Sequence, residues 1–176
     1  MHSDVDDLAA RVERIEAELA IGQLPIRYAM AVDARDIDSW VGLFVEDVRV
    51  GRDQFGREAL RDWIVPQLRT FRRSVHHITG HRIEMVDSDH ATGAVYCRAE
   101  HEVDDRWIVI AVCYFDDYRR VGGEWYFARR RDEHFYGADI VEHPQAVGFN
   151  SWEGSKAPRL PERFPTWDGF WSAEGG

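Results

Sequence analysis

The histidines are the first candidates for catalytic residues in this chain. Eight histidines are present, and His76, His77, His81 and His101 fall in segments whose composition is typical of strands. Successive side chains of a strand face opposite sides of a sheet, so only one of His76 and His77 can face a concave pocket. His76 and His101 can face each other from adjacent strands. A neutral imidazole is a base suited to neutral pH.

Asp33 is the second candidate for chemistry. It ends a stretch with helical spacing, and the C-terminus of a helix is a poor place for an anion. An acid is tolerated there when it is exposed or when it has a cationic partner, and an inward-facing histidine would be such a partner. The alternative interpretation is a surface residue, or a cap for the element that follows.

Several other chemistries lack their motifs. The sequence contains no GxGxxG or GxxxxGK[ST] loop, no CxxC pair and no HExxH. A metal site built from His76, His101 and an acid would match no established spacing, so we expect no metal and no cofactor. The net charge of −10 repels phosphates and anionic lipid, so neither a nucleic-acid partner nor a membrane partner is expected.

The location follows from the cysteines and the N-terminus. The acidic, amphipathic start lacks the basic and apolar regions of a signal peptide, and no apolar run is long enough to span a membrane. Cys97 and Cys113 are the two cysteines, and we expect both to be reduced thiols in a cytoplasmic protein.

The helical and strand patterns separate cleanly along the chain. Helical spacing covers four stretches, residues 4–20, 24–34, 37–44 and 57–71, with Gly22 and Pro25 between the first two. Strand patterns follow at residues 75–86, 92–103, 107–121 and 125–137, separated by Asp- or Gly-containing turns. Helices followed by an antiparallel meander predict an α+β fold, with the helices on one face of a curved sheet. We expect one domain over residues 1–143. Residues 144–176, rich in Pro and Trp, should form a tail packed on the domain or on a neighbouring subunit.

Four segments resemble the SnoaL-like group of the nuclear-transport-factor-2-like superfamily. They are YAMAVDARDIDSWVGLFVEDVRV (28–50), SVHHITGHRIEMV (74–86), TGAVYCRAEHEV (92–103) and DDYRRVGGEWYFARRR (116–131). The resemblance covers about residues 5–140. It implies a cone-shaped α+β barrel, in which the N-terminal helices and a strongly curved antiparallel sheet enclose an apolar pocket.

Within that superfamily the sequence is most similar to scytalone dehydratases, hexachlorocyclohexane dehydrochlorinases and bile-acid dehydratases, which use an Asp–His pair across the pocket. The resemblance carries these roles to Asp33 and His76. His101 matches the histidine of an R-x-x-H pattern in scytalone dehydratases, and Tyr28 matches a tyrosine five residues before the aspartate in bile-acid dehydratases. Tyr114 is a departure, because scytalone dehydratases have Asn at that position.

These residues predict a cofactor-independent lyase or isomerase that acts on a hydrophobic ring compound such as a steroid, polyketide or terpenoid. His76 would be the general base, Asp33 its orienting partner, and Tyr28, His101 or Tyr114 the acid or oxygen binder. His77 should face away and be dispensable. The residues expected to line the pocket, each of which also suits an ordinary core position, are Trp40, Phe44, Trp63, Tyr114, Val112 and Phe135. The alternatives are a non-catalytic binding or accessory subunit of the same fold, and a polyketide cyclase.

A homo-oligomer is expected from the strand over residues 107–121. Its outward-facing side chains would expose a large apolar patch in a monomer. These side chains are Trp107, Val109, Ala111, Cys113 and Phe115. Symmetry mates would cover this patch most simply, and the resemblance favours a trimer over a dimer.

Overall fold

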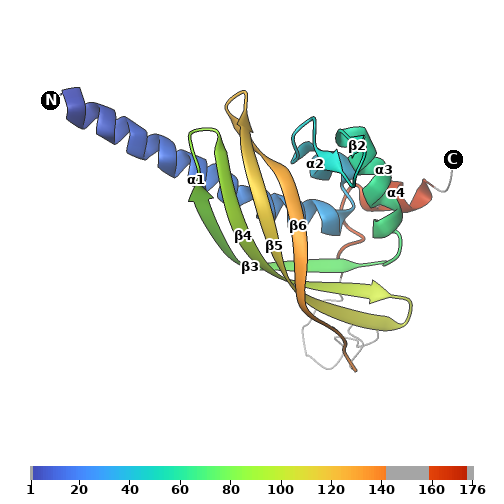
Figure 1. Ribbon diagram of the computed structural model, residues 1–176. Coiled ribbons are helices and arrows are strands. Elements are labelled where there is room, and N and C mark those ends of the chain that lie inside the picture. Colours follow the sequence, from blue (N-terminus) through green and yellow to red (C-terminus); the bar gives the residue numbers. More distant parts are fainter. Residues whose placement is uncertain (1, 142–158, 174–176) are drawn as a thin grey trace.

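A single long helix, α1 (His2–Ala34), forms the N-terminal part of the protein (Figure 1). The computed structural model describes residues 2–141 and 159–173. The sequence predicts two helices here, and that prediction is wrong. Pro25 lacks the N–H that would bond the Ile21 carbonyl, but its side chain is fully buried beside Leu24. Packing against the sheet therefore holds the helix together where the local sequence favours a break.

Two shorter helices complete the N-terminal half. Asp36 caps α2 (Ile37–Gly42), because its carboxylate accepts the Ser39 N–H at 3.0 Å. A two-stranded ribbon of β1 (Arg49–Val50) and β2 (Gln54–Phe55) precedes α3 (Arg57–Leu68). No helix in the described ranges is long and apolar enough to cross a bilayer.

The second half of the chain is one antiparallel sheet in the order β3-β4-β5-β6. Its strands are β3 (Ser74–Met85), β4 (His90–Val103), β5 (Arg106–Val121) and β6 (Glu124–Asp139). The strands bend strongly, and the helices lie against the concave side (Figure 1). The sheet remains open along β3 and β6, so helices and sheet together form the cone. The α+β fold class is confirmed.

Two β-bulges in β6 change which side chains face the concave side. Tyr118 pairs with Phe127 but Asp117 pairs with Arg129, and further on Val112 pairs with His134 but Ala111 with Tyr136. At each place β6 holds one extra residue, which reverses the alternation of faces. Trp125 and Phe127 are buried before the first bulge. Between the two bulges, the even-numbered side chains face inwards.

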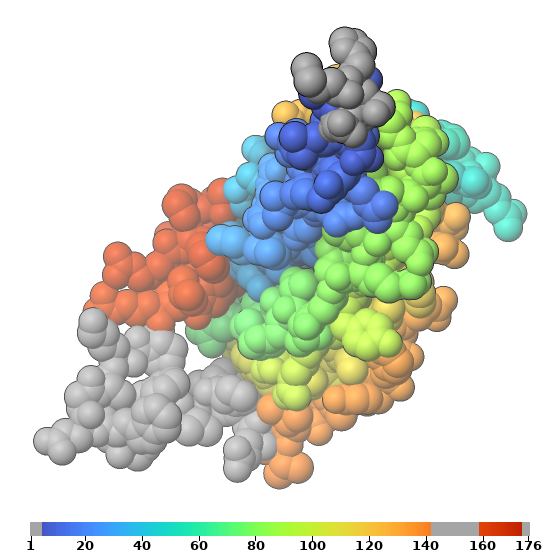
Figure 2. All heavy atoms as spheres, turned by 90° about the vertical axis from the view of Figure 1, so that its left-hand side faces the viewer, coloured from blue at the N-terminus to red at the C-terminus, as the bar shows by residue number. Residues whose placement is uncertain are grey.

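The described part of the C-terminal segment packs on the protein's own α1. The Thr166 hydroxyl donates to the Ala34 carbonyl at 2.7 Å. The buried ring of Trp167, the first residue of α4 (Trp167–Ser172), lies 5.2 Å from the Arg35 guanidinium. Figure 2 shows this red segment beside the C-terminal part of α1. Most of the Pro- and Trp-rich tail predicted from the sequence, including Pro144 and Trp152, lies outside the described residues.

The outer face of β5 is less exposed than the sequence predicts. Trp107, Val109 and Cys113 are buried within the chain, and Phe115 is the exposed member of the predicted patch, at 43%. Their burial removes the original argument for a trimer through this face. Cys97 and Cys113 are free cysteines, and both are buried.

Candidate active site

The end of α1 fixes the position of Asp33. Arg35 adopts a left-handed backbone conformation, with φ of 58°, which turns the chain out of the helix. Its buried guanidinium donates to the Val32 carbonyl at 2.7 Å and to the Ser74 hydroxyl at 3.0 Å. Ser74 in turn donates to Asp33 Oδ1 at 2.7 Å. The acid at the helix C-terminus thus has a cationic neighbour, linked to it through one hydroxyl.

His76 lies directly against Asp33. Its backbone N–H donates to Asp33 Oδ2 at 2.9 Å, and its Nδ1 lies 2.7 Å from Asp33 Oδ1. A carboxylate only accepts hydrogen bonds, so Nδ1 carries the proton in this contact and the neutral ring has a free lone pair on Nε2. This is the tautomer that a general base requires. Both side chains are mostly buried.

His76 lines a cavity of about 220 Å³ between the sheet, α1 and α3. A second cavity of about 600 Å³ lies beside it and reaches the β1–β2 ribbon. Tyr28, Trp63, Tyr114 and Asp132 line both, so the two cavities adjoin. The larger cavity alone falls in the volume range of small-molecule sites.

Most of the predicted lining residues lie around this space. Trp40 and Phe44 line the larger cavity, His101 and Val112 line the smaller one, and Tyr28, Trp63 and Tyr114 lie at the junction. His77 faces outwards, where its Nε2 lies 3.6 Å from Glu100. The strand alternation therefore assigns His76 and His77 to opposite faces, as predicted.

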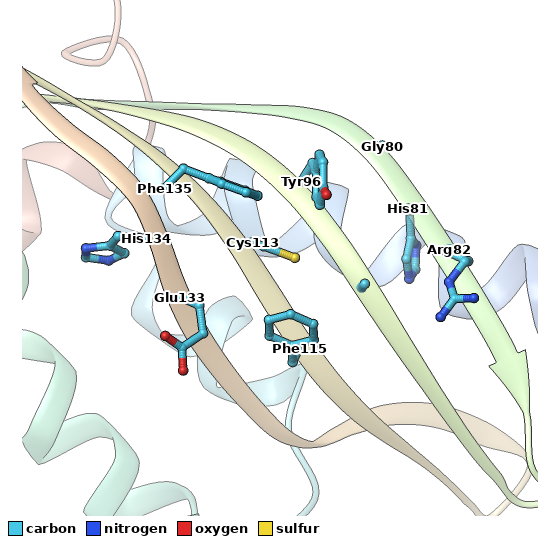
Figure 3. Close-up of a pocket in the computed structure, with 10 residues that line it drawn as sticks. Gly80, His81, Arg82, Tyr96, Cys113, Phe115, Glu133, His134 and Phe135 are labelled. Carbon is cyan, nitrogen blue, oxygen red and sulfur yellow. The ribbon is translucent and has the colours of Figure 1, made fainter.

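Phe135 does not line this cavity, so its predicted place in the lining is wrong. Its ring is exposed on the outer face of the sheet and packs against Tyr96 at 5.4 Å between centroids. Figure 3 shows Phe135 over an outer-face groove with Tyr96, Cys113 and Phe115. The bulges of β6 are the cause, because the first moves odd-numbered residues to the outside and Phe135 is itself the extra residue of the second. His134, the neighbour of Phe135, lines the cavity instead.

Comparison with known proteins agrees with this architecture. The model of the SnoaL-like domain family matches residues 13–131. The chain belongs to the SnoaL-like family. No curated protein sequence matches this SnoaL-like protein significantly.

Solved structures share the fold. A type 2 hexachlorocyclohexane dehydrochlorinase (LinA) is 21% identical, with a TM-score of 0.68, over 74% of this chain and 93% of the other. A provisionally assigned scytalone dehydratase from Novosphingobium aromaticivorans is 23% identical, with a TM-score of 0.65, over 74% and 91%. An NTF2-like protein with a cystatin-like fold from the same organism is 24% identical, with a TM-score of 0.64, over 74% and 89%.

His101 lies beside the Asp33–His76 pair as a neutral ring. Its centroid is 5.7 Å from that of His76 and 4.6 Å from that of Phe71, both edge-on. Burial, together with the neighbouring His76 and the Arg35 guanidinium, lowers the pKa of His101 to about 4. Its Nδ1 is buried and has no hydrogen-bond partner among the described residues. At neutral pH this histidine can shape the cavity and hydrogen-bond a ligand, but it is not a charged acid.

Two tyrosines form the cavity wall next to a caged arginine. The Arg130 guanidinium lies 4.3 Å from the ring centroids of Tyr28, Tyr114 and Phe127. It also makes a bidentate pair with buried Asp116, at 2.8 and 2.7 Å. Burial raises the pKa of both Tyr28 and Tyr114, so both hydroxyls keep their protons. The Arg130–Asp116 pair fixes these rings, and sequence reasoning missed it.

A second carboxylate–imidazole pair borders the same cavity. His134 Nε2 lies 3.0 Å from Asp132 Oδ2, and both side chains line the cavity that holds His76. His134 lies at the edge of β6 and also borders the outer-face groove, and in Figure 3 its ring lies on the other side of the strand from Phe135. The signal in the sequence is the Asp-x-His spacing, which places both on one strand face, but the bulge hides which face that is. Within residues 2–141 and 159–173, no three His, Cys, Asp or Glu side chains gather as a metal site.

Proposed function

We propose that this SnoaL-like protein is a cofactor-independent lyase or isomerase. It would act on a hydrophobic ring compound such as a steroid, polyketide or terpenoid by removing an acidic C–H proton. The observation that carries the proposal is the Asp33–His76 contact at 2.7 Å beside an apolar cavity. The dehydrochlorinase and dehydratase folds among its structural neighbours are compatible with this chemistry.

In the proposed reaction, His76 Nε2 takes the proton next to the activating group of the substrate. Asp33 accepts the Nδ1–H and stabilises the imidazolium that forms. A positioned base contributes roughly 10²–10⁴-fold to such a step. Around His76 and Asp33, which are mostly buried, the aromatic walls limit water and so strengthen the hydrogen bonds that act there.

The proton donor to the leaving group is assigned by position and hydrogen-bond partner. The buried hydroxyls of Tyr28 and Tyr114 suit hydrogen bonding to a substrate oxygen, and so does the neutral ring of His101. His134 is open to solvent and is paired with Asp132 through Nε2, so Nδ1 can face a ligand. We propose His134 as the general acid, with Asp132 as its orienting partner.

Loss of water from 3-hydroxy-1-tetralone tests the proposal, because the product aromatises to fluorescent 1-naphthol. We expect wild-type protein to accelerate its appearance, His76→Ala to return the rate to background, and His77→Gln to keep most activity. Unchanged circular dichroism of His76→Ala would separate a lost base from a lost fold. Full activity in His76→Ala contradicts the assignment. Binding of the ketone without turnover by wild-type protein favours the alternative, a non-catalytic binding or accessory subunit.

We further propose that the protein is a homo-oligomer. The cytoplasmic location stays a prediction, as does the absence of a cofactor. A trimer through the outer face of β5 no longer has its original basis, because Trp107, Val109 and Cys113 are covered within the chain.

A further inference from the structure

An apolar stripe runs along the N-terminal half of α1, away from the sheet. Its members are Val5, Leu8, Val12, Ile15 and Leu19, whose side chains are between 45% and 65% exposed. In Figure 2 this part of α1, in dark blue, stands at the surface that faces the viewer. A surface helix normally turns its apolar side to the core.

The spacing of the stripe is that of a coiled coil. Steps of three, four, three and four residues place Val5, Val12 and Leu19 at heptad positions a, and Leu8 and Ile15 at positions d. A different face of α1, with Ala17, Ile21 and Leu24, is already buried in the core. The helix therefore has two apolar faces, and only one is used within the protomer.

The stripe extends beyond the part that defines the family. The SnoaL-like match begins at residue 13, so the first turns of α1 precede it. A helical segment as short as these first turns, of about 12 residues, is marginal in water when it has no packing partner. Because the C-terminal half of α1 is held by the sheet, the helix is pre-organised, and the ordering cost of pairing is low.

We propose that the stripe pairs in parallel with the same stripe of a second copy of this chain, forming a two-stranded coiled coil. Arg11 occupies a g position and Glu16 an e position, so a parallel pair sets Arg11 of each copy beside the Glu16 position of the other. Val5 and Val12 at a positions, with Leu8 at d, favour two strands, whereas Ile15 at d with Leu19 at a favours a higher oligomer. Both copies use the same surface, so the interface is isologous, and the two sheets lie on the outer sides of the dimer.

An anionic lipid surface is the poorer fit. Residues 5–20 hold Asp6, Asp7, Glu13, Glu16 and Glu18 against Arg11 and Arg14. Interfacial helices that bind anionic lipid carry basic polar faces instead. The acidic flanks favour a protein partner with matched charges, and the second copy supplies them.

Light scattering of the full-length protein at micromolar concentration tests the interface. We expect wild-type protein to have twice the 20.4 kDa protomer mass and Ile15→Glu to have the protomer mass. Ala10→Glu is the matched control, because it adds the same charge to an exposed position of the same helix, and it should stay dimeric. Ile15 is exposed in the protomer, so far-ultraviolet circular dichroism should be equal in all three.

Other results overturn the proposal. The proposal is overturned if the wild-type protein is monomeric or has the mass of three protomers. An Ile15→Glu variant that keeps the wild-type mass, with Phe115→Glu becoming monomeric, moves the interface to the outer face of the sheet.

Oxidised Leu8→Cys should cross-link to itself if the helices are parallel. Cross-linking that appears only when Leu8→Cys and Leu19→Cys are mixed overturns the parallel alignment. None of these measurements depends on turnover, so they are independent of the proposed lyase activity.

Discussion

A hydroxyl that leaves as hydroxide needs a proton, whereas acetate leaves without one. If His134 supplies that proton, His134→Gln should slow 1-naphthol formation from 3-hydroxy-1-tetralone by about 10²-fold. The same variant should have little effect on 3-acetoxy-1-tetralone, which loses acetate. Product fluorescence measures the rates, and the ratio of the wild-type rate to the variant rate is compared between the two ketones.

His90→Gln is the matched control for this prediction. Its imidazole lies 3.0 Å from Asp87 and is about as exposed as that of His134, but the pair lies at the β3–β4 turn. It should leave both rates unchanged. An equal loss with the two ketones in His134→Gln would show that His134 acts in binding rather than as the acid.

The buried ring of His101 makes stability depend on pH. Its folded pKa of about 4 lies below the value near 6.5 of an unfolded chain. Between these values the unfolded chain binds a proton that the folded protein does not, so the free energy of unfolding falls as the pH drops. Above about pH 6.5 both states are neutral at this residue and it contributes no pH dependence.

We expect His101→Phe to remove roughly 2–3 kcal/mol of the stability difference between pH 7 and pH 4.5. Urea unfolding at both pH values measures it. His77→Gln, on the exposed face, should keep the wild-type difference. If His101→Phe also keeps the wild-type stability difference, the pH dependence arises from other residues.

Secondary structure is largely readable from this sequence because most of it obeys local rules. Alternation and turn residues predict all four long strands to within a few residues. The prediction of a helix break at Pro25 is wrong because tertiary packing outweighs a missing hydrogen bond. The prediction that Phe135 lines the cavity is wrong because a bulge changes the face of the sheet on which it lies. No local sequence pattern predicts a bulge. The contact of Asp33 with His76 was expected from the resemblance, whereas Asp132 and His134 depend on the bulge and were missed.

The short helix α4 stabilises the end of α1 and, through Arg35, the support of Asp33. Trp167 is buried against Arg35, so Trp167→Ala should lower the free energy of unfolding by about 3–5 kcal/mol. Urea denaturation measures the loss. Trp63→Ala, which removes a half-exposed indole, should cost much less. Equal losses would mean that α4 does not stabilise the domain.

For the whole molecule, self-association would couple stability to concentration. A dimer dissociates when it unfolds, so mass action predicts that the Tm of the wild-type protein rises with protein concentration. Ile15→Glu should unfold at a Tm that does not depend on concentration. Scanning calorimetry across a hundredfold concentration range compares the two. A constant wild-type Tm would indicate that the folded protomer is stable alone.

The continuity of α1 through Pro25 has a geometric consequence. Leu19 and Asp33 lie on one unbroken helix, so their angular offset is set by the number of residues between them, at about 100° per residue. Inserting one residue before Pro25 would rotate the apolar stripe by about a quarter of a turn relative to the cavity. Inserting seven would almost restore the phase. The orientation of one cavity relative to the other in an assembly is therefore encoded by residue count.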